Sequence, residues 1–162
     1  MSKLISTFFY VGLIPIAPGT YGSAAGLFIA YLIVMFLSLP TLIILSIFTF
    51  FIGTHHIHRY LIDENNTKDP PEIVVDEVVG QWVTICIPLV VFWNFNMLYI
   101  LDSYYFWLLS FFLFRFFDIW KPWPINWADR QETPLGVMLD DILAGCYSAA
   151  LSIFLIFFFG NF

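Results

Sequence analysis

The stretch "PPEIVVDEVVGQWV", residues 70–83, leads into a long apolar run and carries two adjacent carboxylates, Asp76 and Glu77. The two prolines, Pro70 and Pro71, would interrupt any preceding helix and favour the start of a new helix directly after them. The two acids then lie about one turn into the helix and point about 100° apart. Negative charge near a helix N-terminus is favourable, but the neighbours are apolar, unlike a solvated face: Ile73, Val74, Val75, Val78 and Val79. Helix capping and a functional role both remain open here.

The composition of the chain is that of an integral membrane protein. Of its 162 residues, 60% are hydrophobic and 11% are charged, whereas soluble domains average about 25% charged residues. We expect a single domain, 1–162. The net charge of −6 and the lack of a basic block argue against nucleic-acid binding. Cys86 and Cys146 lie in apolar runs and are interpreted as packed hydrophobes. The N-terminus predicts no removable signal peptide.

Five apolar stretches predict the helices of the fold. They are residues 22–38, 41–54, 79–101, 104–117 and 142–160. A perpendicular span needs about 20 residues, so the second and fourth stretches are short unless flanking residues extend them. The prediction is an all-α fold, a polytopic membrane helical bundle of about four to five spans.

The polar residues predict how the bundle is oriented. Breaks at 39–41 and 102–103 fall on one side, which places the polar segments 1–21, 55–78 and 118–141 on the other. All six basic residues lie on or near that side: Lys3, Arg59, Lys68, Arg115, Lys121 and Arg130. Because basic residues concentrate in short cytoplasmic loops, we expect a polar site at the cytoplasmic interface and a C-terminus on the far side.

The segment "PIAPGTYGSAAG", residues 15–26, has the composition of a helix start that could bind phosphate. Pro18-Gly19 is a turn signal, and Thr20 can cap the following helix. Helix N-termini bind phosphate through free N–H groups, and Gly19 and Gly22 allow close approach to the backbone. The alternative interpretation is a capped helix with a small-residue packing face at Gly22 and Gly26.

The segment 114–145 combines basic, acidic and tryptophan side chains. Arg115, Asp118 and Lys121 recur every three residues and would share a helix face, before the prolines at 122 and 124 end the helix. Asp140 and Asp141 open an apolar span, where dipole capping is the alternative to function. Three tryptophans suit an interfacial belt: Trp120, Trp123 and Trp127.

The acidic residues of these segments suggest a cation site. Gathered at one membrane face, the five carboxylates would repel one another unless a cation lay between them. The five are Asp76, Glu77, Asp118, Asp140 and Asp141. Oxygen ligands without a cysteine cluster favour Mg²⁺ or Mn²⁺ over zinc, and Arg115 and Lys121 suit a phosphate ester. The histidines at 55, 56 and 58 could bind metal, but a polar helix end is the favoured interpretation.

Four stretches in order resemble the bacterial phosphatidylglycerophosphatase A family: "PIAPGTYGS" (15–23), "EIVVDEVVGQW" (72–82), "FRFFDIWKPWPINWADR" (114–130) and "GVMLDDILAG" (136–145). The resemblance implies a Mg²⁺-dependent phosphatase of the bacterial cytoplasmic (inner) membrane that acts on phosphatidylglycerophosphate with its site facing the cytoplasm. The family's polar positions fall here on Thr20, Ser23, Asp76, Glu77, Arg115, Asp118, Lys121, Asp129, Arg130, Asp140 and Asp141. The segment 59–69 is less characteristic.

From these residues we predict three sets of roles. Asp76, Arg115 and Lys121 would be catalytic. Glu77, Asp118, Asp140 and Asp141 would hold Mg²⁺, with Asp76 as an alternative to Glu77. The substrate phosphate would meet Gly19, Thr20, Gly22, Ser23 and Arg130.

The sequence leaves several alternatives open. Water attack and an aspartyl-phosphate intermediate are both compatible with the acids. Other lipid phosphates, such as phosphatidic acid, are possible substrates. An ion or proton transporter would place its acids near the bilayer midplane, and a structural protein would use them as helix caps. The Cys-x₅-Arg and DxDxT phosphatase signatures are absent. The number of metal ions and the oligomeric state are not determined.

Overall fold

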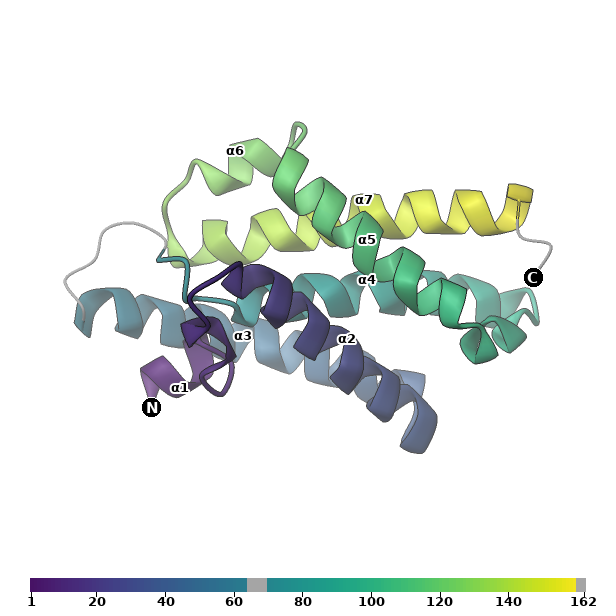
Figure 1. Ribbon diagram of the computed structural model, residues 1–162, viewed down its shortest axis with the longest axis horizontal. Coiled ribbons are helices and arrows are strands. Elements are labelled where there is room, and N and C mark those ends of the chain that lie inside the picture. The colour runs from purple at the N-terminus through teal and green to yellow at the C-terminus, as the bar shows by residue number, and fades with distance from the viewer. Residues whose placement is uncertain (64–69, 160–162) are drawn as a thin grey trace.

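The computed structural model describes residues 1–63 and 70–159, and their regular secondary structure is entirely helical (Figure 1). The elements in chain order are α1 (Ser2–Ser6), the 3₁₀ helix η1 (Val11–Leu13), α2 (Pro18–Phe36), α3 (Leu39–Asp63), α4 (Val75–Asn94), the 3₁₀ helix η2 (Leu98–Asp102), α5 (Tyr104–Trp120), α6 (Ile125–Asp129) and α7 (Pro134–Phe159). Lys68, Glu64 and Asp69, which the sequence analysis considered, lie outside the described residues.

Within residues 1–63 and 70–159, four helices are long and apolar enough to cross a membrane: α2, α3, α4 and α7. The prediction of an all-α bundle with four to five spans is therefore confirmed. The short second stretch does extend into flanking residues, because α3 continues through the histidines to Asp63 over 25 residues. The fourth stretch forms α5, which is 17 residues long and packs against α7.

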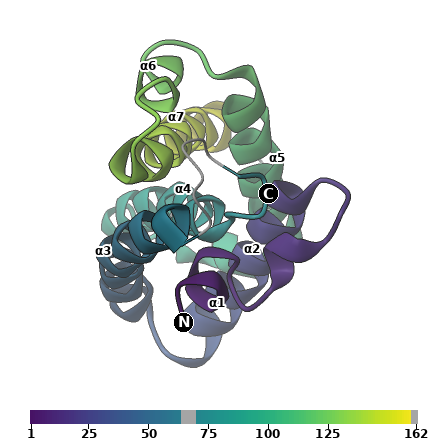
Figure 2. The same ribbon diagram turned by 90° about the vertical axis from the view of Figure 1, so that its left-hand side faces the viewer.

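Helix α4 forms the centre of the bundle, with α2, α3, α5 and α7 around it (Figure 2). Its side chains at Ile85, Leu89 and Phe92 are fully buried. Asp76 and Glu77, at the start of α4, therefore belong to a helix that is surrounded by protein and not by lipid.

The backbones of α4 and α7 approach closely at two glycines. A Cβ atom on Gly80 would lie 2.7 Å from the carbonyl oxygen of Asp141, and one on Gly145 would lie 2.6 Å from that of Gly80. Small residues permit this kind of close packing between membrane helices. The contact fixes Asp141 of α7 beside the first turns of α4.

The helix directions bring the polar segments to one end of the bundle. Helices α2, α4 and α7 begin, and α3 and α5 end, at the left side of Figure 1. The segments 1–21 and 118–141, together with the described part of 55–78, meet there, as the sequence predicted. The assignment of this end to the cytoplasm remains a prediction.

Candidate active site

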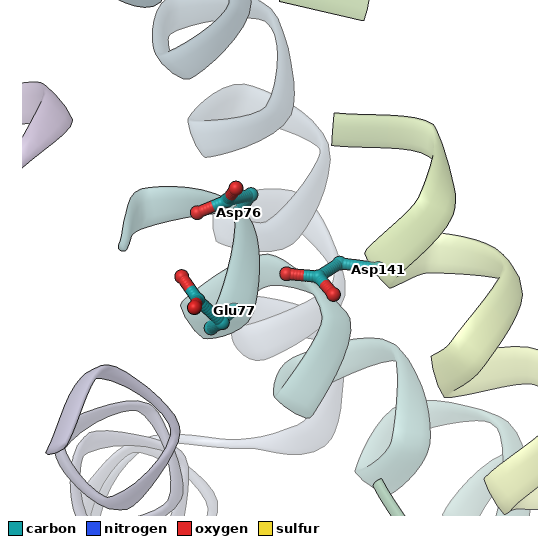
Figure 3. Close-up of side chains that lie close together, drawn as sticks. All are labelled: Asp76, Glu77 and Asp141. Carbon is teal, nitrogen blue, oxygen red and sulfur yellow. The ribbon is translucent and has the colours of Figure 1, made fainter. Parts of the chain in front are cut away.

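Three carboxylates from two helices converge at the polar end of the bundle. Asp76 and Glu77 lie in the first turn of α4, and Asp141 reaches toward them from α7 (Figure 3). One carboxylate oxygen from each residue lies within 4.8 Å of the others. The exposed fractions of Asp76 and Asp141 are only 5% and 3%. Burying carboxylates so close together is costly unless a positive charge lies between them.

The donor atoms of this acidic cluster (Asp76, Glu77 and Asp141) fit a hard divalent cation. Oε2 of Glu77 is buried and has no hydrogen-bond partner among the described residues. Within the same residues, neither Glu77 nor Asp141 forms an ion pair with a basic side chain. Carboxylate oxygens at this spacing are the ligands that Mg²⁺ and Ca²⁺ prefer. The cluster could therefore hold a metal ion.

The position of Asp141 argues against helix capping as its role. Asp140 and Asp141 lie about two turns into α7, which begins at Pro134, whereas the helix dipole acts within the first turn. The capping alternative considered for this acidic pair is therefore wrong. For Asp76 and Glu77, which do lie in a first turn, dipole complementarity and ion binding are compatible.

Arg115 joins α5 to the N-terminal part of α2 beside the cluster. Its Nη1 donates hydrogen bonds to the Asp118 carboxylate and to Oγ of Ser23, the latter at 3.3 Å. The predicted shared face of Arg115 and Asp118 is confirmed by this ion pair. Asp118 also interacts with Asp141, so the guanidinium lies next to the acidic cluster.

Lys121 forms a second set of ion pairs near the cluster. The prediction that Lys121 shares a helix face with Arg115 and Asp118 is wrong. Helix α5 ends at Trp120, and Lys121 follows it in the left-handed conformation, with φ at 45°. The ammonium donates to the Asp129 carboxylate and, at 2.7 Å, to Asp140. Burial lowers the pKa of Lys121, but the Asp140 and Asp129 carboxylates outweigh burial and raise it above its usual value. Lys121 therefore links Asp129 to Asp140 through its ammonium group.

The start of α2 lies directly against Glu77 and Arg115. A Cβ atom on Gly19 would collide with Oε1 of Glu77 and lie 3.3 Å from Nη1 of Arg115. Oγ of Ser23 donates to the carbonyl of Gly19 at 2.7 Å. The helix begins at Pro18 with Ala17 as its N-cap, so the prediction that Thr20 caps it is wrong. Pro18 fits because proline suits the first helical position.

Gly22 and Arg130, two of the predicted phosphate-binding residues, do not lie beside Arg115 and Glu77 as Gly19 does. Gly22 is buried against Val74, where a Cβ atom would lie 2.7 Å from the valine Cβ. Gly26 packs similarly on α4, and its carbonyl accepts a hydrogen bond from Nε1 of Trp82 at 2.8 Å. Arg130 is exposed at the end of α6. Phosphate binding by Gly22 and Arg130 stays a prediction, and the structure gives Gly22 a packing contact as well.

Gln81 and Asp129 are two polar residues near the site that the role assignment did not include. Gln81 follows Glu77 by one helical turn, is fully buried, and its two amide atoms have no hydrogen-bond partner among the described residues. Asp129 accepts from Lys121. The four-residue spacing from Glu77 was the signal for Gln81, because such residues share a helix face.

The Gly19→Ala variant should lose phosphate-releasing activity by about 10- to 100-fold, because the added methyl group must displace the Glu77 carboxylate. The fold should survive, since only the end of a side chain has to move. Gly53→Ala is the matched control, because the nearest atoms to its Cβ would be side-chain atoms of Met138 and Val75 at 3.3–3.4 Å. Rates and thermal unfolding in detergent check both variants. Wild-type activity in Gly19→Ala would contradict this account of the contact.

Comparison with known proteins agrees with these observations. The sequence profile of the family described as phosphatidylglycerophosphatase A matches residues 4–156. A protein named phosphatidylglycerophosphatase A from Escherichia coli is 34% identical over 154 residues, covering 94% of this chain and 81% of that protein. One of the same name from Haemophilus influenzae is 33% identical over 147 residues, covering 90% and 82%.

A third relative carries a different name. A Bacteroides thetaiotaomicron protein named "Putative phosphatidylinositol-3-phosphatase" is 36% identical over 154 residues, covering 91% of this chain and 89% of that protein. No solved structure matches. The family profile covers nearly the whole chain, including all the residues of the acidic cluster and its basic neighbours. The chain belongs to the phosphatidylglycerophosphatase A family.

Proposed function

We propose that this protein is a Mg²⁺-dependent phosphatase of the bacterial inner membrane that converts phosphatidylglycerophosphate to phosphatidylglycerol and phosphate. The observation that supports the proposal most directly is the buried acidic cluster beside Arg115 at one end of a membrane bundle. Family membership supplies the reaction, since two relatives are named for it.

In this proposal Asp76, Glu77 and Asp141 hold the Mg²⁺ ion. Asp118 and Asp140, which were also predicted as ligands, lie outside this cluster. They accept hydrogen bonds from Arg115 and Lys121, respectively. They would orient these cations and complete the negative charge around the metal. When bound, the ion supplies positive charge that neutralises the phosphate oxygens and lowers the pKa of a bound water.

The basic groups of the chain would bind and orient the phosphoryl group. Arg115 presents a planar guanidinium that can bond two phosphate oxygens at once. The N–H groups at the start of α2, around Gly19 and Thr20, would add a partial positive charge beside Arg115. Ser23 holds Arg115 in place through its hydroxyl. Arg130 and Gly22 complete the predicted phosphate contacts.

The proton from the attacking water would pass to a carboxylate that does not bind the metal. Asp76 is the predicted base, and in that case Glu77 and Asp141 would hold the ion. Lys121 is a cation at neutral pH, as lysines ordinarily are, so it can stabilise the charge of the leaving group or of the product phosphate. An aspartyl-phosphate intermediate is the alternative route.

The surroundings of the site fit a substrate held in a bilayer. Trp120, Trp123 and Trp127 are all more than half exposed near the end of the bundle that carries the acids. Tryptophan concentrates at the headgroup level of membranes. A lipid phosphate in the facing leaflet would therefore present its headgroup to the site, which we place on the cytoplasmic side.

Phosphate release from phosphatidylglycerophosphate by the purified, detergent-solubilised protein tests the proposal. We expect release with Mg²⁺, none with EDTA, and a loss of about 10- to 100-fold in Asp118→Asn, since residues that hold metal ligands in place typically have effects of this size. Asp63→Asn, an exposed acid at the end of α3, is the matched control. Phosphatidic acid and phosphatidylinositol 3-phosphate, compared side by side, measure the headgroup preference.

The outcomes of this assay separate the alternatives. Release that continues in EDTA would overturn the metal requirement. Faster phosphate release from one of the other two lipids would show that this lipid, and not phosphatidylglycerophosphate, is the preferred substrate. No release from any of the three, by a folded and Mg²⁺-supplied protein, would contradict the phosphatase proposal and favour the transporter alternative, which ion flux into liposomes then tests.

A further inference from the structure

Gln81 of α4 is a buried polar side chain whose role the fold alone does not explain. It is fully buried, and neither Oε1 nor Nε2 of its amide has a hydrogen-bond partner within residues 1–63 and 70–159. The hydroxyls of three other fully buried residues each donate to a carbonyl of their own helix: Thr84, Ser110 and Ser148. Since buried polar groups in folded proteins are nearly always hydrogen-bonded, we expect the Gln81 amide to have a partner in the working protein.

Helix α2 links Gln81 to the charged groups of the candidate active site. A Cβ atom on Gly26 would lie 3.5 Å from Cβ of Gln81. Gly19, Ser23 and Gly26 share one face of α2, because they lie four and three residues apart. A Cβ atom on Gly19 would lie 3.3 Å from Nη1 of Arg115, and Oγ of Ser23 accepts a hydrogen bond from the same nitrogen. The face of α2 that packs on Gln81 therefore leads to Arg115 within two turns.

Helix α4 brings Gln81 close to Glu77. Glu77 lies four residues before Gln81, on the same helix face and one turn nearer to the start of α4. Long side chains of a helix lean toward its N-terminus, and the N-terminus of α4 is the end that carries the acids. The amide of Gln81 is therefore expected to extend toward the Glu77 carboxylate and not toward the middle of the bundle.

Glu77 and Arg115 carry buried atoms that match the two ends of an amide. Oε2 of Glu77 and Nε of Arg115 also have no hydrogen-bond partner among the described residues. An ionised carboxylate only accepts and a guanidinium only donates, whereas a glutamine amide does both. Oε1 of Glu77 and Nη1 of Arg115 both lie within 3.3 Å of the position that a Cβ atom on Gly19 would take. One amide could therefore serve both side chains.

We propose that Gln81 is a positioning residue of the active site. Its amide donates to Oε2 of Glu77 and accepts from Nε of Arg115, with a buried water as a bridge where a direct bond would be too long. The inference rests on the proposed function, in which Glu77 binds the cation and Arg115 binds the phosphate. Because the amide is neutral, it holds the Glu77 carboxylate without adding a positive charge that would compete with the cation.

Gln81→Met tests the inference, because methionine has a similar length and no hydrogen-bonding amide. We expect kcat for phosphatidylglycerophosphate to fall about 10- to 100-fold, as loss of a residue that holds a metal ligand commonly causes, with little change in KM. Thr84→Val is the matched control. Thr84 is equally buried on the same helix and donates to the carbonyl of Gly80 within α4, so this variant should keep the wild-type kcat.

Mg²⁺ binding supplies a second readout that does not need turnover. Thermal unfolding in detergent over a series of Mg²⁺ concentrations gives the concentration at which half of the stabilisation is reached. We expect this concentration to rise about tenfold in Gln81→Met and to be unchanged in Thr84→Val. A residue that only packs would change the unfolding temperature in EDTA and leave the half-saturating Mg²⁺ concentration as it is.

The inference is overturned if Gln81→Met keeps either the wild-type kcat or the wild-type half-saturating Mg²⁺ concentration, or if Thr84→Val loses as much. Gln81→Leu repeats the test if the methionine variant fails to fold. A wild-type protein that binds Mg²⁺ but releases no phosphate would contradict the proposed function, while the Mg²⁺ series still tests Gln81. A wild-type protein that Mg²⁺ does not stabilise would overturn both the cation site and the role of Gln81.

Discussion

Asp141→Asn is expected to lower phosphate release by at least about 100-fold, the largest effect of any single carboxylate in the cluster. Asp141 supplies the α7 side of a group that is otherwise carried by the first turn of α4. Without it, Asp76 and Glu77 would have to hold the cation from one helix alone. The asparagine keeps the size of the side chain, so packing against α4 should be preserved.

Although Asp141→Asn should lower activity, it should raise thermal stability in the absence of a cation. Asp141 is 3% exposed, and removing one of three buried negative charges relieves repulsion when no cation is present. Asp141→Asn should therefore unfold at a higher temperature than the wild type in EDTA. Added Mg²⁺ should raise the unfolding temperature of the wild type, because an ion that binds only the folded state stabilises it, and should have little effect on the variant.

Thermal unfolding in detergent, with Mg²⁺ and with EDTA, measures this reversal beside the rate assay. Asp63→Asn again serves as the control and should resemble the wild type in both measurements. Two results would contradict the assignment of Asp141 to the cation site. One is an unchanged rate, and the other is a Mg²⁺-dependent stabilisation of Asp141→Asn as large as that of the wild type.

Arg115→Met should also lower kcat by about 100-fold or more, as removal of one fixed donor in a phosphate or oxyanion site commonly does. Nη1 of Arg115 bonds Ser23 and Asp118 together, so the guanidinium is held in place before substrate arrives. Arg115→Lys should recover only part of the rate, because an ammonium group cannot reproduce the planar fork.

Stability measurements separate the chemical role of Arg115 from its structural one. Removing the guanidinium leaves the Asp118 carboxylate, 12% exposed, without its ion-pair partner, which destabilises the fold. The double variant Arg115→Met/Asp118→Asn should regain stability but not activity. Arg59→Met, on the exposed part of α3, is the control. Full activity in Arg115→Lys would contradict the bidentate role, and equal losses in Arg59→Met would point to a general charge effect.

Much of the fold could be predicted from hydrophobicity alone. In lipid, the backbone N–H and C=O groups of a single span can form their hydrogen bonds only within a helix. Apolar runs separated by polar breaks therefore predict helices. Helices α2, α4 and α7 each include most of their predicted stretch. Helix ends were predicted less well. Thr20 is not a cap, Lys121 lies beyond α5, and α7 begins well before Asp140, because these ends depend on local turns that a hydropathy pattern does not encode.

The sequence by itself determined which residue types could act. Carboxylates at the starts of apolar segments, an Arg-x₂-Asp spacing and a glycine-rich helix start indicated a cation and a phosphate, since few other functions tolerate charge beside a membrane span. The four motifs also sufficed to indicate the family, and the direction of each span placed them at one end of the bundle.

Only the tertiary structure decided which of these residues share a site. Asp76, Glu77 and Asp141 form the acidic cluster, whereas Asp118 and Asp140 accept from Arg115 and Lys121. This division depends on the close contact between Gly80 and Gly145, which sets how α7 is rotated and shifted against α4. Helix–helix distance and rotation follow from packing of side chains far apart in the chain, and a linear spacing of acids contains no information about either.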